Sequence, residues 1–339
     1  MYNHDPKVRK KSQHMLQSMF PRTEEGFAKL IHSMLYFQYV PLYIYHMKTS
    51  TNHLMPPHIQ REYQYPQGVE NEIIDEYVRT ASNECGAKSR SLKTNSYHAK
   101  VLRLEDAEQL VSLDEDLDLG TLPKNIMPYE VARDLIIDAP DKIAVIDCIC
   151  RMANGNDGCF PRDVCLLIGD PWVTWALDRD RFLNGRLITK DEALKILREC
   201  HERGNVHAAF FKDVAAGRVY SICNCCPCCC TALQAQNYLK VPMMAGSGYI
   251  AKIDEDKCKK CGQCAKKCNF LAIKMEDGKP VVNPDLCKGC EGCLTFCKFG
   301  AITMEPGDFS VMAPMDIEVL KAQKAEQEAA AAAEASEEK

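Results

Sequence analysis

The sequence lacks both the long apolar run of a membrane-spanning helix and the leader of an exported protein. Its longest apolar stretch, residues 34–45 (MLYFQYVPLYIY), contains Gln38 and Pro41 and has about half the length needed to cross a bilayer. The first residues are polar and basic, and no apolar segment follows them, which argues against a secretory signal. We therefore expect a cytoplasmic protein without a transmembrane segment, in which residues 34–45 form a buried helix interrupted at Pro41.

The sequence also lacks an excess of positive charge. The net charge is −5, and the segment 316–339 contributes −4 of it through seven acidic side chains and three lysines. The rest of the chain is nearly neutral, so we expect no nucleic-acid partner. No glycine-rich dinucleotide fingerprint follows an expected strand, so the sequence does not support direct NAD or flavin chemistry.

Cysteine, by contrast, is abundant and clustered. Of the 20 cysteines, one lies in residues 1–127, eleven in 128–240 and eight in 249–305. Adjacent cysteines close a disulfide only with strain, and the short spacings within the clusters are those of metal ligands. We interpret the cysteines as thiolate metal ligands in a reducing compartment.

The distribution of cysteine predicts the domain organisation of an α+β protein. We expect a mainly helical and loop-rich N-terminal region over 1–127, a cysteine-rich α+β domain over 128–240, a small domain over 249–305 and a solvated Ala/Glu/Lys tail over 316–339. Residues 246–248 (GSG) are expected to be a flexible joint between the second and third parts.

Within the cysteine-rich domain, hydrophobic spacing and capping residues predict individual elements. Thr189 and Glu192 have the spacing of a helix-initiating capping box. The expected elements are helices over 128–140 and 189–205, a strand over 142–147, a hairpin of 206–211 with 218–222, and a helix after Cys230.

The small domain over 249–305 is an internal repeat. Cys258 recurs as Cys287, and the other three cysteines of the first half recur at the same interval. Each half has the spacing C-x2-C-x2-C-x3-C. Three cysteines on one tight loop can ligate three corners of an iron–sulfur cubane, and the fourth serves the other cluster. We therefore expect two [4Fe–4S] clusters, one held by Cys258, Cys261, Cys264 and Cys297, and the other by Cys287, Cys290, Cys293 and Cys268.

These interlocked motifs resemble the bacterial-type 2[4Fe–4S] dicluster ferredoxin domain. The resemblance covers about residues 249–305 and implies a pseudo-twofold ferredoxin fold with an electron-transport role. The family usually has proline after the fourth cysteine of each motif, where this sequence has Asn269 and Lys298. Two zinc sites are the alternative, but zinc typically takes its thiolates from paired C-x2-C knuckles and not from interlocked runs of four.

Five lysines crowd the first of the two motifs. Positive charge favours the reduced form of a cluster and should raise its reduction potential. The lysines form either a solvated face or a docking patch for an acidic redox partner; they are Lys257, Lys259, Lys260, Lys266 and Lys267.

A second set of ten cysteines lies in CICRMANGNDGCFPRDVC (148–165) and CNCCPCCC (223–230). Both segments follow an expected strand, so they converge at one end of a sheet if those strands are neighbours. Arg151 should keep nearby thiols deprotonated, and His207 is either a further ligand or a core histidine. The first choice of ligands is Cys148, Cys150, Cys159 and Cys165, followed by Cys223, Cys226 and Cys229.

The combination CICR…CNCCPCCC is similar to a cysteine-rich region that precedes dicluster ferredoxin modules in iron–sulfur proteins of anaerobic microbes. This resemblance covers about residues 128–305 and implies one or more further iron–sulfur clusters. A structural zinc site and a thiol-based redox centre are the alternatives. Ten thiols exceed the four ligands of one cubane, so some of them are expected to support the ligands or to pack around them.

Together these features predict an iron–sulfur electron-transfer protein. We expect it to be an electron-carrying subunit or partner of an anaerobic reductase, with a redox protein as its partner and with no catalytic residue of its own. One alternative is an iron–sulfur enzyme whose middle domain holds a substrate-binding cluster. Another is a thiol-based redox sensor or a cluster-delivery protein.

Overall fold

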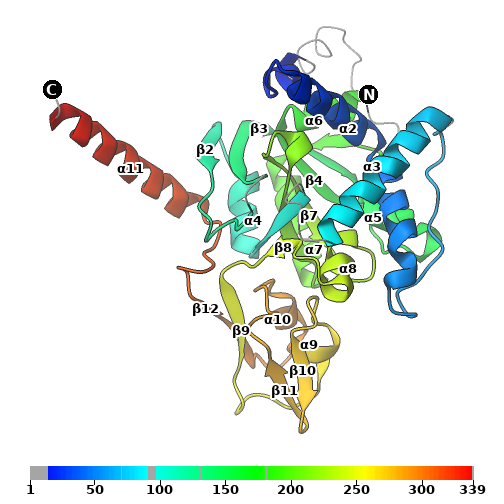
Figure 1. The fold of residues 1–339 in the computed structure, drawn as a ribbon. Helices are drawn as coiled ribbons and strands as arrows, with labels where there is room; N and C mark the ends of the chain where they lie inside the picture. Colours follow the sequence, from blue (N-terminus) through cyan, green and yellow to red (C-terminus); the bar gives the residue numbers. More distant parts are fainter. Residues whose placement is uncertain (1–13, 70, 91–96, 130–131, 180–181, 338–339) are drawn as a thin grey trace.

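The computed structural model describes residues 14–69, 71–129, 132–179 and 182–337, except for 91–96. Its main body is an eight-stranded sheet with the order β2-β3-β4-β7-β6-β1-β8, and β5 pairs with β3 (Figure 1). Neighbouring strands are antiparallel except for β1 and β8. The strands are β1 (Tyr97–Leu102), β2 (Leu117–Thr121), β3 (Asp134–Asp147), β4 (Asp163–Asp170), β5 (Arg186–Ile188), β6 (Val206–Lys212), β7 (Val219–Cys225) and β8 (Met244–Ala245).

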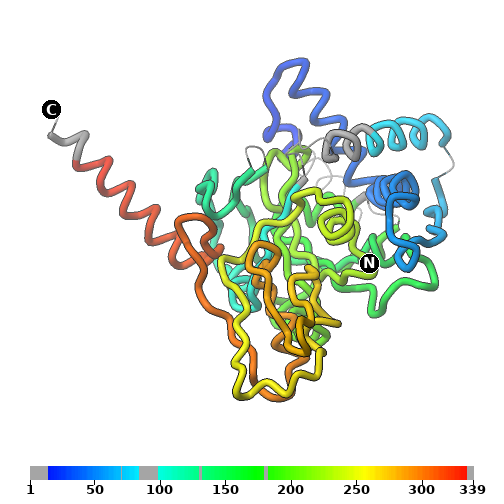
Figure 2. The backbone as a smooth tube through the Cα atoms, turned by 60° about the horizontal axis from the view of Figure 1, so that its bottom comes forward, coloured from blue at the N-terminus to red at the C-terminus, as the bar shows by residue number. Residues whose placement is uncertain are grey.

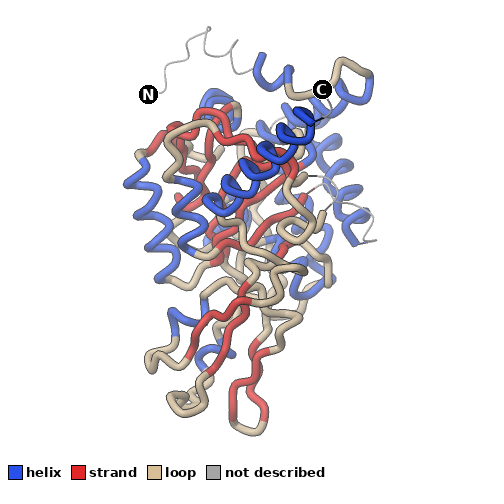
Figure 3. The backbone as a smooth tube through the Cα atoms, turned by 90° about the vertical axis from the view of Figure 1, so that its left-hand side faces the viewer, coloured by secondary structure: helices blue, strands red, loops and turns tan. Residues whose placement is uncertain are grey.

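Helices cover both faces of this sheet, as Figure 3 shows. Alternating side chains of β3 enter two separate cores: Ala144 and Ile146 pack with α2, α6 and α8, whereas Ile143 and Val145 pack with α4 and α7. The helices are α2 (Glu24–Thr51), α3 (Glu72–Arg90), α4 (Leu104–Val111), α5 (Ile149–Ala153), α6 (Trp172–Arg179), α7 (Lys190–Glu202) and α8 (Thr231–Leu239), and short 3-10 turns are η1 (Asn52–Leu54), η2 (Gly155–Asp157) and η3 (Asp213–Ala215).

Several elements lie where the sequence predicts them. Helix α7 begins after Thr189, whose hydroxyl accepts a hydrogen bond from the Glu192 amide at 3.2 Å. The β6–β7 hairpin forms with Ala209 opposite Ile222. The long helix α2 is kinked at Tyr39, two residues before Pro41, because proline cannot donate the backbone hydrogen bond at that point.

The helix expected over 128–140 is wrong, because residues 134–140 are the first half of strand β3. Leu135 and Ile137 are buried while Ile136 between them is partly exposed, which is the two-residue period of a strand. Pairing with β2 stabilises this extended segment. The helix was expected because Val131, Leu135 and Ile136 have helical spacing, and nothing in the neighbouring residues indicates the partner strand.

The boundary expected at residue 127 does not separate two sheets. Strand β1 pairs with β6 along its whole length, and β2 pairs with β3, so residues 97–121 belong to the same sheet as the cysteine-rich segment. The tail is also attached: α11 (Ile317–Glu337) projects from the body in Figure 2, but Ile317 and Leu320 in its first turn are buried in the core beside α4.

A smaller C-terminal body lies beside the edge of the sheet domain (Figure 1). It contains two pairs of antiparallel strands: β10 and β11 form a hairpin, and β9 pairs with β12. Helix α10 follows α9, and β12 follows β10, at the same interval that separates Cys258 from Cys287, so the sequence repeat is also a structural repeat. The elements are β9 (Tyr249–Ile253), α9 (Gln263–Lys266), β10 (Ile273–Glu276), β11 (Lys279–Val282), α10 (Gly292–Phe296) and β12 (Ile302–Pro306).

Candidate metal centres

The eight cysteines of the C-terminal body lie around two separate cavities. The two cavities are similar in size, with about 340 and 330 Å³ of empty space that is partly open to solvent. Each one receives three cysteines from one motif and the fourth cysteine from the other motif. The first is lined by Cys258, Cys261, Cys264 and Cys297, and the second by Cys268, Cys287, Cys290 and Cys293.

Backbone amides are aimed at the sulfur atoms of both fourth cysteines. The Ala272 amide donates to Cys268 Sγ at 3.1 Å, and the equivalent amide of the second half, that of Ala301, donates to Cys297 Sγ at 3.4 Å. Such N–H···S bonds stabilise thiolates, which are the form that binds metal. Four sulfur donors around one cavity, with amide donors to the sulfurs, fit a [4Fe–4S] cluster.

The two cavities differ in their exposure to solvent. Cys261 in the first cavity is exposed, whereas Cys290 in the second packs against the core of the sheet domain. Burial raises the pKa of Cys290 to about 12, so metal binding there must displace its proton. We call the first cavity and its four cysteines the distal quartet and the second the proximal quartet.

Asn269 joins the proximal quartet to the sheet domain. Its side chain is buried, and its Nδ2 atom donates to the Gly204 carbonyl at 3.0 Å and lies 3.6 Å from Cys290 Sγ. Its own carbonyl accepts a hydrogen bond from Asn237 Nδ2 of α8 at 2.9 Å. Asn269 stands where the ferredoxin family usually has proline, and the structure gives it a bridging position that proline could not fill.

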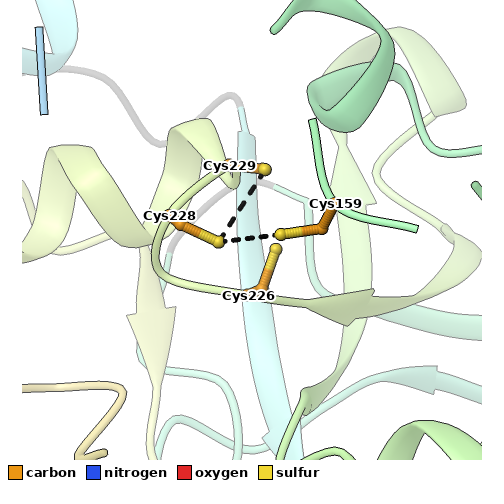
Figure 4. A group of neighbouring side chains, drawn as sticks. All are labelled: Cys159, Cys226, Cys228 and Cys229. Carbon is orange, nitrogen blue, oxygen red and sulfur yellow. Dashed lines mark hydrogen bonds between the residues drawn. The ribbon is translucent and has the colours of Figure 1, made fainter. Parts of the chain in front are cut away.

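In the sheet domain, four cysteines form a compact group beyond the end of β7. Cys159 lies in the loop before β4, and the others lie in the turn between β7 and α8 (Figure 4). Their sulfur atoms all lie within 4.8 Å of one another, and the Sγ atoms of Cys159 and Cys228 are 3.1 Å apart. Hydrogen bonding, first from Cys226, lowers the pKa of Cys159 to about 6. This four-thiol group consists of Cys159, Cys226, Cys228 and Cys229.

Six further cysteines form a second group on the α2 side of the sheet. Interactions between thiols run in a continuous chain through all six, in the order Cys148, Cys165, Cys223, Cys225, Cys230 and Cys150. Hydrogen bonding, first from Cys165, lowers the pKa of Cys223 to about 6. These cysteines border an apolar cavity under α2. We call them the six-thiol group.

The sheet topology explains why these segments meet. The sequence predicted convergence on the condition that the strands before the two segments are neighbours. The strands β3 and β7 are not neighbours, because β4 lies between them. Both are antiparallel to β4, so they run in the same direction and end at the same edge. The register of Leu166 with Ile222 also places Cys165 across from Cys223. The two segments therefore meet although their strands are not neighbours, because one strand between them keeps both running in the same direction.

All seven cysteines chosen from the sequence lie in one of the two groups, but the sequence did not divide them. It missed Cys225, Cys228 and Cys230. Cys223 and Cys225 lie two positions apart on β7 and share a face, whereas Cys226 begins the turn and points into the other group. The period of two along the expected strand was the signal that could have separated Cys225 from Cys226.

Two buried cations accompany the thiols. Burial opposes the charge of Arg151, but thiols of both groups, Cys226 and Cys148 among them, hold the pKa of its guanidinium above its usual value. Burial lowers the pKa of Lys48, while Cys150 and Cys230 oppose that shift. Arg151 was expected near the thiols from the sequence; Lys48 was not, because it comes from the distant helix α2.

His207 is a core residue of the sheet in this structure. Its Nδ1 atom lies 2.6 Å from Asn224 Oδ1, and its ring stacks on that of His201 at a centroid distance of 5.6 Å. Burial lowers the pKa of His207 to about 4, which keeps the ring neutral. It is not a member of the four-thiol group.

Comparison with known families supports the C-terminal sites. Residues 251–274 and 279–302 each match a family described as a 4Fe–4S binding domain. The two matched segments contain all eight cysteines of the distal and proximal quartets. No curated protein matches the chain. The chain therefore carries two iron–sulfur binding domains at its C-terminal end and a separate cysteine cluster in its sheet domain.

In the part of the chain that the structure describes, none of the helices combines the length and the apolar character needed to span a bilayer.

Proposed function

We propose that this chain is an iron–sulfur electron-transfer protein. The observation that carries the proposal is that two sets of four cysteines, each assembled from both halves of the repeat, surround two cavities of nearly equal size. We assign one [4Fe–4S] cluster to the distal quartet and one to the proximal quartet, in a dicluster ferredoxin fold. Bound clusters of this kind accept and donate single electrons.

The side chains around the distal quartet give it a solvent-facing, lysine-rich surface. The distal quartet has the exposed Cys261, and the lysines near its motif are exposed. Lys257 pairs with Asp254 at 3.0 Å, and the Lys267 ammonium lies 5.3 Å from the centre of the Phe296 ring. We propose that this face docks an acidic redox partner or a subunit of an anaerobic reductase in the cytoplasm.

The proximal quartet follows the distal quartet on the proposed electron-transfer route. Asn269 and Asn237 connect it to α8, and α8 begins directly after Cys230 of the six-thiol group. Cys230 and Asn237 are seven positions apart, or roughly 10 Å along a helix. This short separation supports electron transfer between the proximal quartet and further iron–sulfur clusters in the sheet domain.

An enzymatic function is the second candidate, and the apolar cavity under α2 favours it. Tyr36, Phe37, Val40 and Ile44 line this cavity opposite the six-thiol group, so a small apolar molecule could reach a metal bound there. Cyanide binds an open iron position. A change in one cluster's EPR signal on adding cyanide to the reduced protein supports the enzyme, whereas unchanged spectra support a pure electron carrier.

Anaerobic purification of the full chain, followed by iron and sulfide analysis and by EPR during stepwise reduction, tests the electron-transfer proposal. Two cubanes give about eight irons per chain, and each further cubane adds about four. Replacement of both Cys258 and Cys287 by alanine should remove the ferredoxin-type signals. Cys200→Ala is the matched control, because Cys200 is buried in α7 outside both quartets and both thiol groups. Zinc in the quartets, or retention of all iron in the double variant, would refute the proposal.

A further inference from the structure

We propose that the ten thiols of the sheet domain form two independent metal sites, and that the six-thiol group holds an iron–sulfur cluster whose negative charge is balanced by Lys48. This inference deepens the proposed electron-transfer function and rests on it. It adds a division of ligands between two sites and names a residue that controls the potential of one of them.

The compactness of the four-thiol group carries the first step, although Cys226 and Cys229 also reach the cavity that the six other thiols line. Cys159 interacts with Cys226, Cys228 and Cys229, and its sulfur lies within 4.8 Å of each of theirs. The six other thiols line one cavity under α2, where the strand register places Cys165 of β4 across from Cys223 of β7. Four sulfurs at mutual distances this short suit one tetrahedral metal ion.

The number and position of the other thiols carry the second step. Six adjacent sulfurs exceed the four positions of a tetrahedral ion, so a polynuclear cluster suits this group better than a single zinc ion. Cys223 and Cys225 on β7 and Cys165 on β4 form a rigid wall, and Cys148, Cys150 and Cys230 lie at the ends of neighbouring elements. Iron–thiolate bonds would form as these thiols release their protons to solvent.

Lys48 carries the third step. Its side chain is 2% exposed, and it enters the thiol-lined cavity from α2. Its Nζ atom donates to Gln234 Oε1 at 3.1 Å and lies 5.0 Å from the centre of the Tyr63 ring. Within the described ranges Lys48 makes no ion pair with a carboxylate, and the titratable groups that face it are thiols, with Cys150 and Cys230 foremost.

A buried ammonium without a compensating anion is strongly unfavourable. An iron–sulfur cluster with four thiolate ligands is an anion, and placing it beside Lys48 removes that cost. A fixed positive charge also stabilises the reduced cluster, which carries one more negative charge, so Lys48 should raise the reduction potential of this cluster and leave those of the distal and proximal quartets unchanged.

The test uses the full chain purified without oxygen. The double variant Cys165→Ala/Cys223→Ala should lose about four irons and one EPR signal while the four-thiol group keeps its metal. The double variant Cys159→Ala/Cys228→Ala should lose the metal of the four-thiol group while the six-thiol signal remains. Simultaneous loss of both metals in either variant, or full iron retention in the first, would overturn the proposal.

Lys48→Met tests the role of the charge while every thiol remains in place. The midpoint potential of one cluster should become more negative, and those of the distal and proximal quartets should not move. Lys29→Met is the control, because Lys29 is an exposed lysine of the same helix. Lys48→Gln provides the same measurement if the methionine variant folds poorly. Unchanged potentials in the folded variant would overturn the assignment of Lys48.

The same experiment separates this inference from the proposed electron-transfer function. Only about eight irons in the wild-type protein, with working ferredoxin-type signals, would refute the cluster of the six-thiol group and leave the electron-transfer proposal standing. Absence of the ferredoxin-type signals would refute the electron-transfer proposal itself.

Discussion

Replacing Asn269 with alanine is expected both to loosen the attachment of the C-terminal body and to lower the reduction potential of the proximal cluster. The substitution removes the Nδ2 donor that reaches the Gly204 carbonyl at 3.0 Å and Cys290 Sγ at 3.6 Å. The Gly204 carbonyl then remains buried without this partner, at a cost of about 2 kcal/mol. Fewer hydrogen bonds to a ligand sulfur destabilise the reduced cluster, so its potential should fall.

Anaerobic urea titration followed by circular dichroism measures the stability, and EPR-monitored redox titration measures the potential. Asn237→Ala is the matched control, since it removes only the 2.9 Å bond to the Asn269 carbonyl and touches no ligand sulfur. It should reduce the stability by about 1 kcal/mol without moving the potential. Lys298→Ala, at the exposed equivalent position of the other half, should change neither. An Asn269→Ala protein with wild-type stability and potential would show that this bridge has no role.

Three further predictions concern the stability of the folded chain. Gly289→Ala should destabilise the protein by about 2 kcal/mol more than Gly300→Ala in urea titrations. A Cβ at Gly289 would lie only 2.2 Å from Ser247 Oγ, whereas a Cβ at Gly300 would have no atom within 4 Å. Burial lowers the pKa of Lys100 from 10.5 to about 7, so between these values the unfolded chain binds more protons than the folded one. Stability relative to Lys100→Met should therefore rise with pH over that range, by at most about 1.4 kcal/mol per pH unit, and a constant difference would contradict the buried charge. Truncation after residue 324 should leave the melting temperature nearly unchanged, whereas Leu320→Ala should cost about 3 kcal/mol because Leu320 is buried in the core.

The C-terminal sites were the most predictable part of the molecule from sequence. The expected ligands lie within short local motifs, and the exchange of the fourth cysteine between the halves, which the motif predicts, matches the lining of the two cavities by Cys297 and Cys268. Helix α7 was equally local, since its cap and its apolar face lie within one segment. Such features depend on interactions between residues that are close in the chain, so the pattern of residue types contains them.

Features that depend on distant partners were not predictable in the same way. Residues 134–140 form a strand because β2 pairs with them, and Lys48 reaches the thiols because α2, from a much earlier part of the chain, packs over the sheet. The division of ten thiols into two groups depends on which way each side chain leaves β7 or the following turn. The two-residue period of the expected strand separates Cys225 from Cys226, but a pattern of residue types does not give the directions of the cysteines in the turn.

The departures from the internal repeat indicate which half of the ferredoxin-like body faces the sheet domain. Phe270 is 5% exposed and packs into the sheet core, whereas Phe299, its equivalent in the second half, is 46% exposed beside the distal quartet. Asn269 is likewise buried where Lys298 is exposed. A symmetric two-cluster module has no preferred direction, but these pairs give one end a docking interface and leave the other end open to solvent. The asymmetry follows from contacts that the duplicated motifs alone do not require, and it orders the proposed route from the solvent-facing quartet through the proximal quartet and α8 to the thiols beside Lys48.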